Sequence, residues 1–299
     1  MAKFKTNYSR KSGKGSDAIV KVGLFAAIVG GLFYIFNLFT GNNTPATSES
    51  TDEYVAEAYY LPTSTTGRIV NRRHYSLSYN EDHEQAEWVA YVLKKEQLDM
   101  PWEERSDEFL PDPSIKTGSA TPDDYRNSGY DRGHLVPAAD MAFNKEAMQE
   151  TFYMSNISPQ ARNFNKGVWR ELEELTRDWA RKNKQLYVVT GPVLSETPKS
   201  TIGDNEVSVP VAYFKVLLDL TDPEVKAIAF VLPNEISYEP LFKFATSVDK
   251  VEALTQIDFF PELMPDDLED QLESTFNIDL WEFNKKRYDL RIQKWNKQQ

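Results

Sequence analysis

The sequence of 299 residues contains no cysteine. Without a thiol, the chain cannot form a disulfide framework, use a cysteine nucleophile, or bind zinc or an iron–sulfur cluster through thiolates. Histidine is also scarce, so chemistry that needs an imidazole must use one of three side chains, His74, His83 or His134. By contrast, 40% of the residues are hydrophobic and 13% are aromatic, which is typical of a folded domain with a sizeable core.

Basic residues are in deficit. The 34 Lys and Arg residues face 46 Asp and Glu residues, and the net charge of −12 argues at first against a polyanionic partner such as nucleic acid. The deficit is uneven, because residues 1–16 and residues 284–299 each carry +5. Asp17 and Lys21 cancel, so residues 41–283 must carry −22 for the total to be −12. The chain is therefore an acidic body between two basic ends.

A hydrophobic run of 19 residues, Val22–Thr40, follows the first basic end and is long enough to cross a bilayer. Because bases in residues 1–21 precede it and only acids follow it closely, the positive-inside rule predicts a cytoplasmic N-terminus. The rest of the chain would then be extracytoplasmic, or periplasmic in a Gram-negative bacterium. A cleaved signal peptide, a mitochondrial presequence and a buried core helix are the alternatives. We expect a single-pass membrane protein with an uncleaved transmembrane anchor.

Runs with strand character and runs with helix character follow the anchor. Alternating or aromatic and β-branched residues predict strands at residues 75–79, 88–93, 186–190, 209–220 and 225–232. Helical spacing predicts helices at residues 145–150, 165–182 and 248–255. This order favours an α+β fold with a mixed or antiparallel central sheet and flanking helices.

Three segments are interpreted by composition. Residues 41–66 are rich in Ser, Thr, Asn and acids, which predicts a flexible linker. Residues 101–129 are rich in Pro, Asp, Gly and Ser and predict a long loop, which in a compact domain is often functional. Residues 264–299 predict a C-terminal helical extension. Its last part, residues 279–299, has an amphipathic pattern, and we expect its bases to pack on acidic surface rather than to bind nucleic acid.

The sequence Asp131-Arg132-Gly133-His134 lies among strand-forming residues. Successive side chains of a strand point to opposite faces, so Arg132 and His134 should share one face. A guanidinium holds a phosphate oxygen through two donors, and a neutral imidazole can take a proton from water. Gly133 between them would allow the backbone to approach a ligand closely. The pattern therefore favours chemistry on a phosphodiester.

A second group of polar residues follows. After Ser155–Gln160, the side chains of Asn165, Trp169 and Glu173 are spaced four residues apart, which predicts one stripe along a helix. On such a helix, the amide oxygen of Asn165 and the carboxylate of Glu173 can approach one metal ion. Oxygen ligands suit hydrated Mg²⁺, with Mn²⁺ as the alternative.

With these three motifs in this order, residues 67–263 resemble the DNA/RNA non-specific endonuclease family, whose active site is a ββα-metal motif. The resemblance implies that His134 is the general base, that Asn165 binds Mg²⁺ directly and that Glu173 acts through metal-bound water. It also implies that Arg132, and Arg105 upstream, hold the phosphate, and that Asn156 supports the active site. The implied substrates are DNA and RNA. Since the body is acidic, the bases that bind them must be local, and we expect them to be Arg105, Arg132 and Arg162.

Each role has an alternative. His134 can be a structural histidine, and Asn165 can cap its helix while Asn163 is the ligand. Glu173 can belong to a solvated acidic face, as Glu171 and Glu174 suggest. At the level of function, the alternatives are a tethered nucleic-acid-binding module without catalysis and a phosphodiesterase that acts on a non-nucleic substrate.

Overall fold

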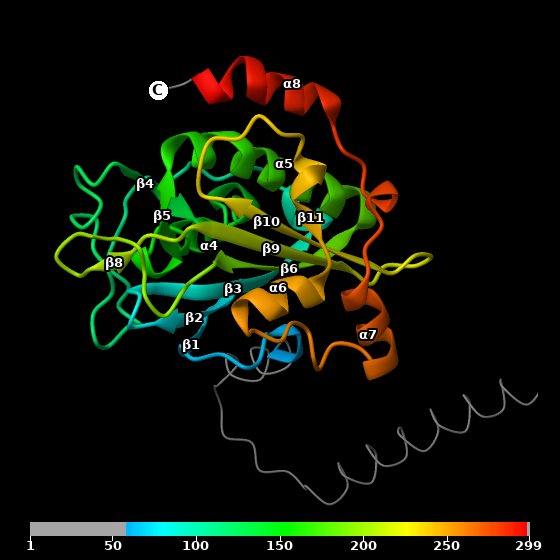
Figure 1. Ribbon diagram of the computed structural model, residues 1–299, viewed down its shortest axis with the longest axis horizontal. Coiled ribbons are helices and arrows are strands. Elements are labelled where there is room, and N and C mark those ends of the chain that lie inside the picture. The colour runs from blue at the N-terminus through cyan, green and yellow to red at the C-terminus, as the bar shows by residue number, and fades with distance from the viewer. Residues whose placement is uncertain (1–57, 298–299) are drawn as a thin grey trace, which may run out of the picture. The chain divides into compact units, whose positions relative to one another are not determined.

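The computed structural model describes residues 58–297 (Figure 1). The predicted anchor at residues 22–40, the basic segment before it and the linker up to residue 57 lie outside these residues. Within residues 58–297, none of the helices has the length and apolar content that a membrane crossing requires.

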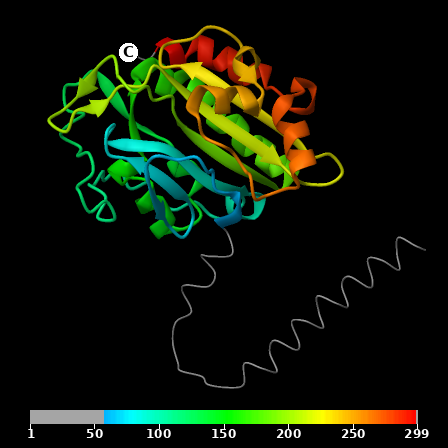
Figure 2. The same ribbon diagram turned by 60° about the horizontal axis from the view of Figure 1, so that its bottom comes forward.

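Seven strands form one antiparallel sheet in the order β1-β2-β3-β6-β9-β10-β11, and its twist is visible in Figure 2. Their bounds are β1 Arg68–Asn71, β2 Ser76–Asn80, β3 Gln85–Lys94, β6 Gln185–Pro192, β9 Ala212–Asp219, β10 Lys226–Pro233 and β11 Ala245–Thr246. Each of the five predicted strands overlaps one strand of this sheet. The prediction of an α+β fold around an antiparallel sheet is confirmed.

Helices cover both faces of the sheet. On one face, α5 (Arg170–Asn183) packs through Trp179 onto residues such as Leu217. On the other face, α6 (Val248–Thr255) and α7 (Asp266–Ser274) pack onto residues such as Val216. Neighbouring residues of β9 thus belong to opposite layers, as the alternation of side chains along a strand requires. The sheet therefore lies between α5 on one face and α6 and α7 on the other.

A pair of strands outside the main sheet precedes α5. Strand β4 (Tyr130–His134) pairs antiparallel with β5 (Ile157–Ala161), so that His134 lies opposite Ile157. Between them lie η2 (Ala138–Asp140), α4 (Lys145–Glu150) and η3 (Met154–Asn156), and α4 has the bounds that the sequence predicts. The chain then enters a π-helical turn, η4 (Phe164–Trp169), which leads into α5. Strands β4 and β5 with α5 therefore form a ββα unit.

The predicted continuous helix from residue 165 is wrong. Gly167 has φ −105° and ψ −110°, which interrupts the helix between η4 and α5. A Cβ atom there would lie only 2.8 Å from Oδ1 of Asn296, so glycine also allows η7 (Trp295–Lys297) to pack closely. Because of this break, Trp169 points into the core against Phe164, with ring centroids 5.4 Å apart. It does not continue the stripe of Asn165 and Glu173.

The segment before Gly67 is not a free linker throughout. After η1 (Ala58–Tyr60), Thr66 Oγ1 donates to Glu87 Oε2 at 2.8 Å and the Gly67 amide donates to Glu87 Oε1 at 2.9 Å. Thr63 also pairs with Asp258 through the backbone. The folded part therefore begins before Gly67, because the buried carboxylate of Glu87 on β3 holds these residues.

The C-terminal residues form α7, η6 (Ile278–Leu280), α8 (Lys285–Gln293) and η7, not one helix over residues 279–299. Arg291 on α8 is fully buried, with Nε 2.6 Å from Glu171 Oε2. Breaking a buried pair by removing one partner costs about 3–5 kcal/mol, so this contact fixes the extension on α5. Arg287 also pairs with Asp178, at 2.5 Å. These two bases of the extension thus pack on acids of α5.

The remaining elements are short. Helix α3 (Lys95–Leu98) follows β3, strands β7 (Thr201–Ile202) and β8 (Val207–Ser208) pair separately, and η5 (Leu241–Phe244) precedes β11. Between α3 and β4 the structure has no helix or strand, so residues 101–129 form the predicted long loop.

Candidate active site

A cleft of about 420 Å³ lies where the long loop, β4 and α5 meet. It brings together five residues that the sequence selects from distant positions: Arg105, Arg132, His134, Asn165 and Glu173. Asn156 and Arg162 do not line it. The ββα unit therefore joins the loop arginine, the strand pair and the helix carboxylate in one place.

His134 ends β4 and stands between two aromatic rings. Its ring centroid is 5.5 Å from that of Phe109 and 4.8 Å from that of Phe152. Burial, and after it the positive charge of Arg105, lowers the pKa of His134 to about 3. The imidazole is therefore neutral at neutral pH and able to accept a proton. Its Nε2 atom is buried without a hydrogen-bond partner among the residues described.

The rings of Phe109 and Phe152 also contact the two predicted arginines. The guanidinium carbon of Arg132 lies 4.6 Å from the ring centroid of Phe109, and that of Arg105 lies 5.0 Å from the centroid of Phe152. Cation–π contacts of this kind hold a guanidinium in place without using its hydrogen-bond donors. Arg105 pairs in addition with the exposed Asp107, at 2.6 Å. Two cations thus flank the imidazole and remain able to hold a phosphate.

Asn165 is oriented by Asp131. Its Nδ2 atom donates to Asp131 Oδ2 at 3.1 Å, which leaves Asn165 Oδ1 free to bind a cation. The other oxygen of Asp131 lies 3.6 Å from Nη1 of Arg162, so Arg162 reaches the site only through this carboxylate. Asn163, not Asn165, occupies the N-cap position of η4, and its side chain makes no capping hydrogen bond.

Glu173 faces the cleft from α5. Burial raises the pKa of Glu173, while the positive charges of Arg177 and Lys215 oppose the rise. Lys215, on β9, is fully buried with Nζ 5.0 Å from the ring centroid of Trp169, and burial lowers the pKa of Lys215. Within residues 58–297 the carboxylate of Glu173 has no hydrogen-bond or ion-pair partner, so it too is free to act on a ligand.

The donors of the cleft fit a hard divalent cation. Asn165 Oδ1 is an uncharged oxygen donor, and the Glu173 carboxylate is an anionic one. Neither forms a hydrogen bond with another described residue. Oxygen donors of this kind, completed by water, suit Mg²⁺. A different acidic group, Asp249 with Glu252 and Glu273, lies on the α6 and α7 side of the sheet and is no part of the cleft.

Comparisons with known proteins show the family of the chain. The sequence profile of the DNA/RNA non-specific endonuclease family matches residues 55–266. The chain belongs to this family. It is 33% identical over 210 residues to the mitochondrial endonuclease G of Homo sapiens, covering 66% of this chain and 71% of that protein. It is 37% identical over 209 residues to the mitochondrial nuclease EXOG of Danio rerio, covering 65% of this chain and 61% of that relative.

A solved structure of an EndoG/EndoGI complex is similar in fold, with a TM-score of 0.65 and 29% sequence identity. The similarity covers 73% of this chain and 95% of that one. Family and fold together make this chain a nuclease.

Asn156 lies behind the cleft, in the segment that follows His134. Its Oδ1 atom accepts from the Val136 amide at 2.9 Å, and its Nδ2 atom donates to the carbonyls of Val136 and Thr151 at 3.0 and 2.9 Å. The fully buried amide is thus occupied by backbone and does not face the substrate. It fixes the segment that follows His134, which fits the supporting role that the resemblance implies and not a catalytic one.

Gly133 has a packing role. A Cβ atom at this position would overlap the side chain of Gln160 on β5. The glycine therefore allows β4 and β5 to pair closely, and this contact, not an approach to a ligand, explains it here.

Sequence reasoning missed three bases of the cleft, Lys166, Arg170 and Arg177. Arg170 and Arg177 are three residues before and four residues after Glu173, so helical spacing alone contained the signal for them. With Arg105 and Arg132 they bring five bases to the cleft, against the two acids Glu173 and Glu174. The nuclease is acidic overall, but its cleft has an excess of positive charge.

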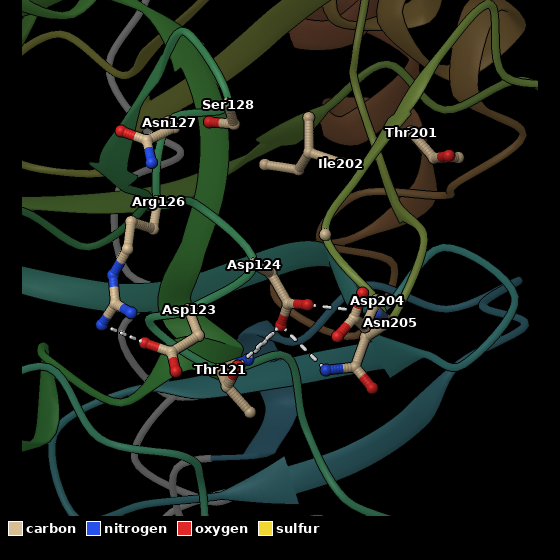
Figure 3. Close-up of a pocket in the computed structure, with 11 residues that line it drawn as sticks. Thr121, Asp123, Asp124, Arg126, Asn127, Ser128, Thr201, Ile202, Asp204 and Asn205 are labelled. Carbon is tan, nitrogen blue, oxygen red and sulfur yellow. Dashed lines mark hydrogen bonds and ion pairs between the residues drawn. The ribbon is translucent and has the colours of Figure 1, made fainter.

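A second cavity, of about 630 Å³, lies between residues 121–128 and residues 201–205. Figure 3 shows its buried Asp124 held between Thr121 and Asn205. Although burial acts to raise the pKa of Asp124, hydrogen bonds from Asn205 and Thr121 outweigh it and lower that pKa. The carboxylate is already satisfied by the protein, and the cavity contains none of the predicted site residues.

Proposed function

We propose that the cleft hydrolyses phosphodiester bonds of DNA and RNA in a metal-dependent reaction with little sequence preference. One observation carries the proposal: a neutral imidazole, two arginines and two free oxygen donors face one cleft of a family nuclease. Binding alone requires neither a base nor metal ligands, which disfavours a module without catalysis.

His134 is the general base in this proposal. Its neutral ring takes a proton from the water that attacks phosphorus. Arg132 and Arg105, held over Phe109 and Phe152, bind the phosphate oxygens beside the imidazole. An anionic phosphate between the arginines would also stabilise the imidazolium that forms, since it offsets the charge of Arg105.

Asn165 and Glu173 would hold the metal ion, Asn165 through Oδ1 and Glu173 through an intervening water. Mg²⁺ is the proposed ion, with Mn²⁺ as the alternative. When bound, such an ion neutralises charge that develops on the phosphoryl and leaving 3′ oxygens. Asp131 orients the amide of Asn165, with Oδ1 available to the ion, by accepting a hydrogen bond from its Nδ2 atom. The expected products carry 5′-phosphate and 3′-hydroxyl ends.

We also propose that residues 22–40 anchor the nuclease in a membrane, with the N-terminus in the cytoplasm and the cleft on the other side. The support is the sequence alone: bases before the apolar run and acids after it. Protease added to intact cells or spheroplasts should degrade residues 58–297. Protection of these residues until the membrane is permeabilised would contradict this orientation.

Substrate competition tests the activity. The purified full-length chain is given plasmid DNA, RNA and a small bis-aryl phosphate, each in Mg²⁺ and in EDTA. We expect nicking and linearisation of the plasmid and degradation of RNA in Mg²⁺ only, with the small ester a poor competitor.

Two results would favour the alternatives. DNA binding that survives EDTA, without cleavage in Mg²⁺ or Mn²⁺, would identify a binding module. Turnover of the small ester that nucleic acid does not inhibit would identify a phosphodiesterase with a non-nucleic substrate.

A further inference from the structure

Three acidic side chains converge on the face of the sheet opposite the cleft. Asp249 and Glu252 are on α6 and Glu273 is on α7, and each offers one carboxylate oxygen within 4.8 Å of the other two. The two helices that carry them share one hydrophobic cluster, through Val251 and Leu272 among others. Apolar contacts of α6 and α7 therefore hold the three carboxylates together; Figure 1 shows the two helices side by side.

Glu273 is the unusual member of this group. It is only 7% exposed, and its Oε1 atom is buried without a hydrogen-bond partner among the described residues. A buried oxygen with no partner loses its hydration without compensation, which costs about 1–3 kcal/mol, and more if it is charged. An exposed acidic cluster needs no explanation, but a buried and unpaired carboxylate beside two others does.

Within residues 58–297, no positive charge pairs with these three carboxylates. In the described part of the chain, no Lys, Arg or His forms an ion pair with Asp249, Glu252 or Glu273. Among the described residues, the one hydrogen bond to these carboxylates comes from the Phe259 amide to Glu252 Oε1, at 2.9 Å, so the other carboxylate oxygen of Glu252 remains available. Burial, and after it the negative charges of Glu252 and Glu269, raises the pKa of Glu273 to about 9. The three carboxylates therefore lack a counter-charge, and a cation from solution would supply one.

We propose that Asp249, Glu252 and Glu273 bind a hard divalent cation, best matched by Ca²⁺, which ties α7 to α6. Two carboxylate oxygens that each lie about 2.4 Å from one Ca²⁺ ion are at most about 4.8 Å apart, so the three oxygens are close enough to share one ion. Ca²⁺ also accepts irregular geometry and completes its shell with water, which suits three ligands from two helices. Mg²⁺ requires distances of about 2.1 Å and near-octahedral geometry, a stricter demand.

The site is separate from the nuclease chemistry. Glu273 lies beyond residue 266, where the family match ends, so the family resemblance does not supply it. The ion would act on stability: it would fasten the first helix of the C-terminal extension to a helix of the matched domain.

Thermal unfolding of the purified full-length chain, treated with EDTA, dialysed and titrated with CaCl₂, tests the proposal. Wild-type protein should gain roughly 5 °C in Tm at a 100-fold excess over Kd. Glu273→Gln should lose this gain while keeping wild-type nuclease activity in Mg²⁺. Asp270→Asn removes an exposed charge from the same helix outside the group, and it should keep the gain. Asn165→Ala, which removes the proposed ligand of the cleft, should also keep it.

Three results would overturn the proposal. One is no Ca²⁺-dependent gain in the wild type up to 10 mM CaCl₂, on the order of the weakest Ca²⁺ sites. The second is a gain that persists in Glu273→Gln, and the third is a gain lost in Asn165→Ala but not in Glu273→Gln, which would assign it to the cleft. If Glu273→Gln fails to fold, Asp249→Asn, at an exposed position, is judged by the same criteria.

Discussion

Two glutamates, Glu173 and Glu273, have raised pKa values, on opposite faces of one sheet. Around Glu173, burial raises the pKa and the charges of Arg177 and Lys215 oppose it. Around Glu273, burial raises the pKa and the charge of Glu252 adds to it. The first carboxyl is balanced by cations of the chain, whereas the second depends on a proton or a cation from solution. A raised pKa therefore has a different meaning at each site.

The same contrast explains the charge of the protein. A net charge of −12 argues against a nucleic-acid partner, yet the cleft has five bases against two acids. The acidic residues gather elsewhere, in the α6 and α7 group among other places. Local arrangement, not total charge, decides what this nuclease can bind.

The largest effect within this comparison should come from Asn165. Asn165→Ala removes the proposed metal ligand, so we expect cleavage in 1 mM Mg²⁺ to fall at least about 100-fold, with partial recovery at higher Mg²⁺. Asn163→Ala, two residues away, is the matched control and should retain nearly full activity. Equal losses in the two variants would mean that the helix start, not the ligand, matters.

Asp131→Ala should have an intermediate effect. Without its acceptor, the amide of Asn165 loses its fixed orientation, and support groups of this kind are worth about 10–100-fold in metal affinity. The Mg²⁺ concentration for half-maximal activity measures this. An unchanged value with a lowered maximal rate would assign Asp131 a role in the chemistry instead.

Lys215→Met tests the balance around Glu173. Lys215 lowers the pKa of Glu173, so its removal should raise that pKa further, and the carboxylate would form only at higher pH. The acidic limb of the pH–rate profile should shift upward, with roughly a tenfold loss below pH 7 and little change above pH 9. Lys182→Met, at the exposed end of α5, is the control and should leave the pH–rate profile unchanged. A uniform loss of activity at all pH values in Lys215→Met would indicate that Lys215 has a packing role only.

Glu273→Gln tests the second glutamate, and it should raise the stability of the protein at alkaline pH. The pKa of Glu273 is raised from 4.5 to about 9, so the folded protein binds a proton more tightly than the unfolded chain. Stability is therefore lost as pH rises from about 4.5 toward 9, and glutamine removes this loss. In EDTA the variant should exceed wild type by roughly 3 °C in Tm at pH 8 and match it at pH 4.5. A variant less stable than wild type at pH 8 would contradict the burial and charge repulsion that raise the pKa of Glu273.

The smallest effect concerns salt. Because at most five bases line the cleft, the slope of log Kd against log salt for DNA binding in EDTA should stay below about 5 in magnitude. Arg132→Ala should reduce it by about 1. A steeper slope would show that binding uses a basic surface well beyond the cleft.

Much of the cleft was predictable from sequence because its members lie in short motifs. Strand alternation placed Arg132 and His134 together and helix spacing placed Glu173 near Asn165, while only the family resemblance joined these two groups in one site. The helix break at Gly167 was not predictable, since it depends on the packing of η7, more than a hundred residues away in sequence. Lys215 is the one base in an otherwise mostly apolar strand, but only the antiparallel sheet reveals which layer it faces.

The aromatic pair that holds the arginines was also beyond the sequence. Phe109 comes from the long loop and Phe152 from the turn after α4, and only tertiary packing joins them to His134. The role of Asn156 depends likewise on which backbone groups its amide reaches.

His134→Ala tests the central claim most directly, namely that this imidazole is the base of a metal-dependent nuclease. Single-turnover cleavage of plasmid DNA in Mg²⁺ should slow by about 10²–10⁴-fold, while DNA affinity in EDTA and Tm stay near wild type. A cleavage rate within about twofold of wild type would contradict the mechanism.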